Sequence, residues 1–281
     1  MKGKVCFSFD VEEWFMVENL RSVFPTETWN HQKSRVGEST ERILDLLEEK
    51  GIKATFFMLG CVAKESPDLV RKISNRGHEV ASHGYSHQMT NGLSKEEIRR
   101  DIVRSKNLLE AITGTQVLGY RAPSFSINED LLDVLKEAGF LYDSSLHDFK
   151  THDRYGSIKS DGNGRPFRHV SGIIEIPVSV CKFGRFKVPI GGGGYFRLMP
   201  GQFYRRLVEK QIRDTNIFAF YLHPWEIDDG QPKVRIRPRS YQFRHYVNIH
   251  KTLGKLESLV TFLKNIDVDF CTYRQIAENI G

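Results

Sequence analysis

The 281-residue sequence is poor in cysteine, and its cysteines form no short motif. The four cysteines are far apart along the chain: Cys6, Cys61, Cys181 and Cys271. A zinc knuckle or a redox-active pair needs a C-x-x-C spacing, which is absent. We therefore expect buried free thiols rather than a site built on cysteine.

Long apolar runs are also missing. No stretch approaches the ~20 apolar residues that a membrane-spanning helix needs. The first ten residues include two lysines and Asp10 before any apolar segment of useful length. No secretory signal is predicted on this pattern, and a cytoplasmic location is expected.

Glycine is concentrated at Gly191–Gly194, but the signal of a phosphate-binding loop is missing there. In a P-loop the glycines lead into Lys followed by Ser or Thr. Here Tyr195 and Phe196 follow instead. The run predicts a flexible or close-packed loop at a cleft.

Acidic residues are absent between Gly230 and Lys251, in a chain whose formal net charge is +6. This stretch carries six basic residues: Lys233, Arg235, Arg237, Arg239, Arg244 and Lys251. Such a stretch favours contact with phosphate, an anionic sugar or an anionic membrane surface, and an irregular solvated loop has the same composition. Its aromatic residues form no nucleic-acid-binding module, so no nucleic-acid partner is expected.

The remaining composition is that of a globular protein, with 40% hydrophobic and 27% charged residues. The length allows two small domains or one barrel. Short apolar runs alternate with segments of helical period, such as a helix opened by the Ser94 capping box, which indicates βα units around a parallel sheet. The strands are expected at 5–9, 54–59, 79–82, 117–120, 141–142, 173–176, 217–222 and 268–271. Seven or eight such units favour a barrel over an open sheet.

Polar residues follow these strands repeatedly. In a parallel barrel the chemistry gathers at the carboxyl ends of the strands, where the βα loops lie. The residues in such positions are Asp10, Glu12, Glu13, His83, His87, Arg121, Asp143 and His223. Residues spread over more than half of the chain would therefore meet at one mouth.

His83 and His87 have the H-x-x-x-H spacing that brings two imidazoles to one side of a turn. Two imidazoles with one carboxylate from Asp10, Glu12 or Glu13 would hold a divalent metal and leave positions open for water and substrate. Two surface histidines beside a solvated acidic loop would show the same pattern.

Five segments, taken in order, resemble the motifs of the polysaccharide deacetylase family, the NodB-homology group of carbohydrate esterase family 4. They span residues 4–225 and are Ser8-Phe9-Asp10, Ser82-His83-Gly84-Tyr85-Ser86-His87, Arg121-Ala122-Pro123-Ser124-Phe125, Tyr142-Asp143-Ser144-Ser145 and Tyr221-Leu222-His223-Pro224-Trp225. The segments 191–197 and 223–226 look like the branch of this family that is associated with exopolysaccharide and surface-glycan loci.

The resemblance implies an α/β fold, a distorted (β/α)7 barrel, with one catalytic domain over residues 1–281 and an extension of about 226–281 packed on the barrel. It implies hydrolysis of the acetamido group of an N-acetylated amino sugar to a free amine and acetate. With no signal predicted, a glycan precursor on a nucleotide or lipid carrier is the expected partner, at the inner face of the membrane.

The resemblance also implies the role of each matching residue. His83 and His87 correspond to metal ligands, Asp10 to the general base and His223 to the general acid. Arg121 corresponds to the residue that orients the base. A bound metal lowers the pKa of its water towards about 7 and polarises the amide oxygen, which suits this set of residues.

Four further residues are expected around this set. Asp143 matches the acid that partners the general acid His223. The segment of Phe125 matches a backbone N–H donor to the substrate oxygen, and Tyr195 is expected to bind substrate. Trp225 offers a flat face for a sugar ring, with core packing as the alternative.

The first motif departs from the family, because Val11 stands where the family has a second aspartate, its metal ligand. Valine cannot bind a metal. Side chains alternate along a strand, so Glu12 would point the same way as Asp10. Glu12 is therefore the expected ligand of Zn²⁺, or of Co²⁺ or another divalent ion, while Glu13 would serve only if the chain turned directly after Asp10.

Two other functions remain open on the sequence. Relatives of this fold with altered metal residues hydrolyse cyclic amides without a metal, and His83 and His87 argue against that reaction. A silent glycan-binding protein would need neither the base Asp10 nor the acid His223.

Overall fold

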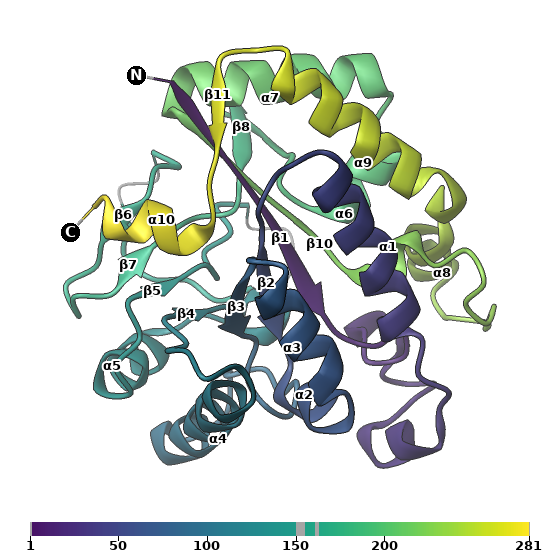
Figure 1. Cartoon of the computed structure of the whole chain (residues 1–281), viewed down its shortest axis with the longest axis vertical. Helices are drawn as coiled ribbons and strands as arrows, with labels where there is room; N and C mark the ends of the chain where they lie inside the picture. The colour runs from purple at the N-terminus through teal and green to yellow at the C-terminus, as the bar shows by residue number, and fades with distance from the viewer. Residues whose placement is uncertain (1, 150–154, 161–162, 281) are drawn as a thin grey trace.

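The computed structural model describes residues 2–149, 155–160 and 163–280. Its core is a curled sheet whose long strand β1 crosses the middle of Figure 1. Among the described residues, seven consecutive neighbours of the sheet run parallel. In spatial order they are β10 (Ile217–Leu222), β1 (Gly3–Val11), β2 (Thr55–Met58), β3 (Glu79–Ser82), β4 (Gly119–Tyr120), β5 (Tyr142–Asp143) and β7 (Ile174–Glu175). The fold is therefore an α/β half-barrel of the predicted type.

The helices lie around the outside of this sheet (Figure 1). They are α1 (Val36–Glu49), α2 (Gly60–Glu65), α3 (Pro67–Asn75), α4 (Lys95–Thr113), α5 (Glu129–Glu137), α6 (Gly193–Leu198), α7 (Gly201–Thr215), α8 (Arg239–Tyr246), α9 (Ile249–Lys264) and α10 (Tyr273–Glu278). The capping box predicted at Ser94 is present, with Ser94 accepting from the N–H of Glu97 at the start of α4. Most of the predicted elements agree with the structure to within a few residues.

The sheet is not closed by regular strand pairing between β7 and β10. The backbone after β7 bridges them instead: the N–H of Ile176 donates to Asp143, and the N–H of Ser179 donates to Ala219. The hairpin of β8 (Val180–Phe183) and β9 (Phe186–Pro189) forms a separate sheet, and β6 (Phe167–Arg168) pairs antiparallel with β7. This irregular junction is what distorts the barrel.

The register of the strands decides which side chains meet. Phe9 of β1 pairs with Leu222 of β10, so Asp10 and His223 leave their strands at the same level. In the same way Ser82 of β3 pairs with Tyr120 of β4, which brings the next residues, His83 and Arg121, side by side.

The late strand β11 (Val268–Phe270) is part of the same sheet. It pairs with the first residues of β1, while β2 pairs with the last residues of β1 on the same edge. Behind it, Tyr273 of α10 is buried and stacks on Tyr142. Part of the region 226–281 is thus built into the barrel as well as packed on it.

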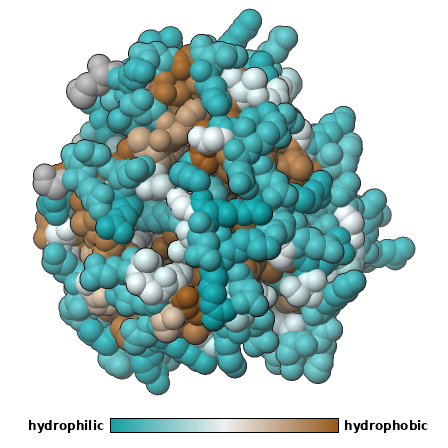
Figure 2. Space-filling view, viewed as in Figure 1, coloured by the Kyte–Doolittle hydropathy of each residue, from teal (hydrophilic) through white to brown (hydrophobic). Residues whose placement is uncertain are grey.

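On the face shown in Figure 2, hydrophobic side chains appear in separate patches between hydrophilic ones. Among the described residues, none of the helices has the length and apolar character needed to cross a membrane.

Candidate active site

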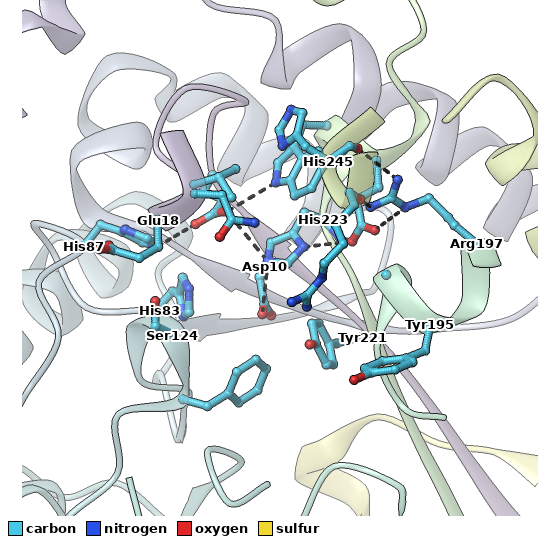
Figure 3. Close-up of a pocket in the computed structure, with 18 of the residues that line it drawn as sticks. Asp10, Glu18, His83, His87, Ser124, Tyr195, Arg197, Tyr221, His223 and His245 are labelled. Atoms are coloured by element: carbon cyan, nitrogen blue, oxygen red, sulfur yellow. Dashed lines mark hydrogen bonds and ion pairs between the residues drawn. The ribbon is translucent and has the colours of Figure 1, made fainter. Parts of the chain in front are cut away.

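A pocket opens at the carboxyl ends of the strands. Most of the predicted site residues line it: Asp10, Glu12, His83, His87, Phe125, Tyr195, His223 and Trp225. Other lining residues include Glu18, Arg197, Tyr221, Glu226, Arg244 and His245. In Figure 3 His83 and His87 lie on one side, Arg197 and Tyr195 on the other, and Asp10 and His223 between them. Arg121 and Asp143 are buried behind this surface.

Glu12, His83 and His87 converge on one point of the pocket. One ligand atom from each lies within 4.8 Å of the other two, and all three residues are buried. Oε2 of Glu12 is 2.5 Å from Nε2 of His87. Two imidazole nitrogens and one carboxylate oxygen form a donor set that suits Zn²⁺, so these residues fit a divalent metal.

His83 is in the state that a metal ligand needs. Nδ1 of His83 donates to the carbonyl oxygen of Arg121 at 2.8 Å, which fixes the ring and leaves Nε2 to face the pocket. Burial lowers the pKa of His83 to about 4, so the ring is neutral near pH 7. Arg21 donates to the carbonyl oxygen of His87 at 3.1 Å and holds the far end of the loop.

The loop between these histidines is held from beneath by Asp101 of α4. Its carboxylate accepts from the N–H of Tyr85 at 2.7 Å and from that of Ser86 at 3.0 Å. Gly84 has a φ of +74°, and a Cβ there would meet Asp101 at 2.8 Å, so glycine is needed at this turn. The loop conformation therefore depends on α4 as well as on β3.

Glu13, the alternative ligand, points away from the pocket. Its carboxylate accepts from the backbone N–H groups of Arg35, at 3.1 Å, and Val36, at 3.4 Å, and from the Ser34 hydroxyl. These groups begin α1, so Glu13 caps that helix and favours its start through the helix dipole. Strand β1 ends at Val11, and the N–H of Glu12 donates to the carbonyl oxygen of Asp10 at 3.1 Å, so Glu12 and Glu13 take their different directions just beyond the strand.

Asp10 and Arg121 form a buried ion pair. Nη1 of Arg121 donates to Oδ1 of Asp10 at 2.6 Å and to the Ser8 hydroxyl at 2.8 Å. The rest of the guanidinium donates to Ser144, to its carbonyl and hydroxyl oxygens at 3.0 Å each. The second oxygen of Asp10 faces the pocket, 4.0 Å from Nε2 of His223. The contact between Arg121 and Asp10 is the one that the family resemblance implied.

His223 is paired with Glu226, and the expectation that Asp143 is its partner is wrong. Nδ1 of His223 lies 2.9 Å from Oε1 of Glu226, three residues later in a 3-10 turn (Pro224–Ile227). Asp143 instead accepts from the hydroxyl and N–H of Ser145, and its side chain bonds to Glu175. The loop after β5 and the strand β7 cover Asp143, so its carboxylate is turned towards Glu175 rather than the pocket.

Arg197 of α6 fixes Glu226 from behind. Its Nε donates to Oε2 of Glu226 at 2.8 Å. Its other nitrogens donate to three carbonyl oxygens around the end of α8: Arg244 at 2.9 Å, His245 at 2.9 Å and Val247 at 2.7 Å. One buried guanidinium thus joins Glu226, the partner of His223, to the end of α8, which lies 47 to 50 residues after Arg197.

The charges around His223 keep its imidazole protonated. Burial lowers the pKa of His223, but the carboxylates of Glu12, Glu226 and Asp10 outweigh burial and raise it to about 9. Burial would raise the pKa of Glu12, whereas His87 and His223 lower it to about 2. A protonated imidazole therefore faces ionised carboxylates across the pocket.

The residues expected to bind substrate differ in their exposure. Tyr195 and the ring of Phe125 line the pocket. The N–H of Phe125 donates to the carbonyl of Ala122 at 3.0 Å, so this group is used within its own turn and not offered to a substrate oxygen.

Trp225 is 6% exposed, with His223 stacked at 5.2 Å and His245 at 4.5 Å. Of the two roles expected for Trp225, core packing is the one that this burial and these stacked rings support.

The glycine run is a close-packed turn beside the acid. A Cβ on Gly193 would lie 2.3 Å from Oε1 of Glu226, and one on Gly192 would lie 2.7 Å from the Tyr221 hydroxyl. A Cβ on Gly191 would meet Val178 at 2.4 Å. Of the two structures expected for this run, the packed one is present at these three positions.

Two family comparisons cover most of the chain. Residues 28–142 match the polysaccharide deacetylase family. This part of the chain is therefore similar to the polysaccharide deacetylases. Residues 144–278 match a family described as a domain of unknown function (DUF3473). The two matches meet beside β5, within one continuous sheet, and the second match contributes β7, β10 and β11 to that sheet.

Known proteins resemble this chain over different lengths. A peptidoglycan-N-acetylglucosamine deacetylase of Bacillus cereus is 35% identical over 104 residues, which are 37% of this chain and 38% of the relative. The chain thus spans little more than a third of the length of that relative. A Mycobacterium smegmatis protein assigned to the polysaccharide deacetylases shares the fold over 99% of this chain and 90% of its own, with a TM-score of 0.67 and 22% identity. An allantoinase covers 98% of this chain and 89% of its own, with a TM-score of 0.63 and 17% identity.

Three residues of this candidate site were not assigned from the sequence: Glu226, Arg197 and His245. The signal for Glu226 was present, because a glutamate three residues after His223 lies on the same side of a helical turn. Arg197 and His245 carry no such spacing, since their neighbours in the site come from other segments of the chain.

Proposed function

We propose that this protein is a metal-dependent hydrolase that removes the acetyl group from an N-acetylated amino sugar. The observation that carries the proposal is the convergence of Glu12, His83 and His87 within 4.8 Å, next to the buried pair of Asp10 with Arg121. The similarity to a relative named peptidoglycan-N-acetylglucosamine deacetylase supports the sugar and the bond.

Glu12, His83 and His87 would hold the metal, with Zn²⁺ or Co²⁺ as the proposed ion. Such an ion lowers the pKa of a bound water to about 7 and polarises the amide oxygen. Asp10, held by Arg121, takes a proton from the attacking water. Because Arg121 is buried and fully hydrogen-bonded, it keeps the carboxylate of Asp10 oriented to the pocket.

His223 gives a proton to the departing amine. Its pKa of about 9 keeps it protonated at neutral pH, and its bond to Glu226 turns Nε2 towards the pocket. The substrate amide would lie between Nε2 of His223 and the three ligand residues, with its sugar ring against Tyr195 and Phe125. In this proposal Asp143 has no role in the pocket.

Three finer points stay predictions. We propose a glycan precursor on a nucleotide or lipid carrier as the substrate. Contact with an anionic membrane is supported by the exposure of Arg235, Arg237 and Arg239, with Phe243 60% exposed beside them. Binding to anionic vesicles that is unchanged when the three arginines are replaced by alanine would contradict membrane contact through this stretch. A cytoplasmic location remains a prediction from the sequence.

The test is acetate release from N-acetylglucosamine oligomers, and from the same sugar on a nucleotide carrier, before and after chelation. We expect activity that is lost on chelation and restored by Zn²⁺ or Co²⁺. Glu12→Gln should abolish metal binding and activity, whereas the matched variant Glu13→Gln should keep both and lose only stability, by about 1 kcal/mol for the weakened helix start.

The other outcomes of this test separate the rival functions. Because the chain shares its fold with an allantoinase, a cyclic amide is the second substrate to test beside the N-acetylated sugars. Hydrolysis of a cyclic amide that survives chelation would replace the proposal by a metal-independent amidase. Sugar binding without acetate release under any condition would indicate a silent glycan-binding protein.

A further inference from the structure

The two carboxylate oxygens of Glu12 have different partners. Oε2 faces the histidines, 2.5 Å from Nε2 of His87. Oε1 accepts a hydrogen bond from the indole Nε1 of Trp225 at 3.2 Å, and Nε2 of His223 lies 3.6 Å away. The side chain of Glu12 is 3% exposed, so these neighbours are its main polar contacts.

We infer that Trp225 is a positioning residue for the metal ligand Glu12. This inference rests on the metal centre of the proposed function and assigns Trp225 a role in it. The indole N–H holds Oε1 and thereby presents Oε2 alone towards His83 and His87. Trp225 lies in the segment 144–278 that matches a domain of unknown function, so that segment would position one ligand of the metal.

Glu12 needs a positioning residue because its side chain is longer than that of an aspartate. A glutamate arm has one more rotatable bond than an aspartate arm, and fixing each additional bond costs conformational entropy. A hydrogen bond to the oxygen that faces away from the histidines restricts this freedom before any ion arrives. Such outer partners of metal ligands typically change metal affinity by 10–100-fold.

The indole itself is fixed on every side. His245 stacks on it with an interplanar angle of 7°, and His223 stacks on the opposite face at 25°. Oε1 of Gln231 accepts from Nε2 of His245 at 2.8 Å, and Nε2 of Gln231 donates to the carbonyl oxygen of Trp225 at 2.8 Å. A donor held this firmly directs a carboxylate better than a mobile side chain or a water molecule.

Metal affinity tests the inference without relying on catalysis. Zn²⁺ binding to the full chain is measured by competition with a chromophoric chelator for wild type, Trp225→Phe and Trp29→Phe. Phenylalanine keeps an aromatic ring between His223 and His245 but removes the N–H. Trp29→Phe is the matched control, because Trp29 donates to the carbonyl oxygen of Phe24 at 3.0 Å and its ring lies 6.4 Å from that of His87.

We expect Trp225→Phe to bind Zn²⁺ at least about tenfold more weakly, with Trp29→Phe close to wild type. Equal affinity of a folded Trp225→Phe and wild type would overturn the inference while leaving the proposed function intact. Failure of wild type to bind Zn²⁺ or Co²⁺ would overturn the metal centre, and the inference with it.

A second measurement uses the wild type and so does not depend on the folding of Trp225→Phe. The chain has three tryptophans, so three indole N–H resonances are expected. Trp14→Phe and Trp29→Phe identify two of them, and the third is that of Trp225. Addition of Zn²⁺ should shift the Trp225 resonance most. An unchanged Trp225 resonance on saturation with Zn²⁺ would contradict the contact.

Discussion

The pocket has two walls that are built in different ways. The metal wall, consisting of Glu12, His83 and His87, comes directly from the ends of β1 and β3, so the register of the sheet places it. The acid wall, consisting of His223, Trp225, Glu226, Arg197 and His245, is assembled from a strand end, a 3-10 turn and two helices. Arg197 joins these pieces by four hydrogen bonds.

This difference shows which interactions hold the side chains of the site in position. On the metal wall, backbone pairing fixes the side chains, and local bonds such as that of Asp101 to the histidine loop refine them. On the acid wall, buried side chains hold backbone segments together, so a single substitution can move several groups. We therefore expect the walls to respond differently to equivalent changes.

The largest effect is expected from the same substitution made on each wall. His83→Phe should remove a ligand and so abolish both Zn²⁺ binding and acetate release. His223→Phe should lower kcat by about 10²–10⁴-fold, the contribution of a general acid, while a ring still stacks on Trp225 and Zn²⁺ still binds. Parallel measurement of kcat and Zn²⁺ affinity distinguishes the two. If His223→Phe lost the metal as completely as His83→Phe, the two walls would not be separable.

Arg197→Met is the next test, directed at the centre of the acid wall. Methionine fills similar space but removes one of the two cations beside the buried Glu226 carboxylate and leaves only His223. Breaking a buried ion pair of this kind costs up to about 3–5 kcal/mol of folding free energy. Urea unfolding of the full chain measures this loss. Arg206→Met, on the exposed side of α7, is the control and should change stability by less than about 0.5 kcal/mol. Equal stability of the two variants would show that Arg197 does not hold the wall.

A smaller effect is expected from one added methyl group. Gly193→Ala would place a Cβ 2.3 Å from the Glu226 carboxylate, so that the carboxylate must shift away from His223. Overpacking of this kind costs about 1–3 kcal/mol, and kcat should fall with it. Gly201→Ala introduces the same group where nothing lies within 4 Å, and it should leave kcat unchanged. A normal kcat in Gly193→Ala would mean that Glu226 needs no fixed position.

The smallest effect concerns the buried pair of Asp143 and Glu175, behind both walls. Burial raises the pKa of each, and the Asp143 charge raises that of Glu175 further. A carboxyl whose pKa is raised on folding stabilises the fold below its unfolded pKa, and this contribution is lost as pH rises through the folded pKa. Wild type should therefore lose stability relative to Glu175→Gln as pH increases above about 4.5, because the amide donates to Asp143 at every pH. If urea unfolding gave wild type and Glu175→Gln the same pH dependence of the free energy of unfolding, the raised pKa of Glu175 would be contradicted.

Much of the fold and of the metal wall was predictable from the sequence. The apolar runs of β1, β3 and β10 fixed the strand positions, and residues directly after parallel strands meet at one edge by geometry alone. The choice of Glu12 over Glu13 as the residue that faces the pocket was also predicted, although β1 ends at Val11, before both residues. These features depend on short-range periodicity, which a single sequence contains.

The acid wall was less predictable because its contacts are long-range. Whether Asp143 faces the pocket or the interior depends on β7, some thirty residues later, which supplies Glu175. A tryptophan beside the acid is compatible with stacking on a sugar ring or with core packing. Only the structure shows that His245 of α8 packs against the indole of Trp225. The irregular junction at β8 and β9 has no regular period from which its position could be inferred.

The pairing of β11 with β1 has a consequence for biosynthesis. Lys4 and Asp269 are 265 positions apart, yet their strands pair, and β2 occupies only the far part of that edge. While the polypeptide emerges from the ribosome, the near part of the edge of β1 stays bare until residues 268–270 have been translated. Unpaired edges are the surfaces through which nascent chains associate wrongly. The strand that carries the proposed base is therefore the one most in need of chaperone protection during translation.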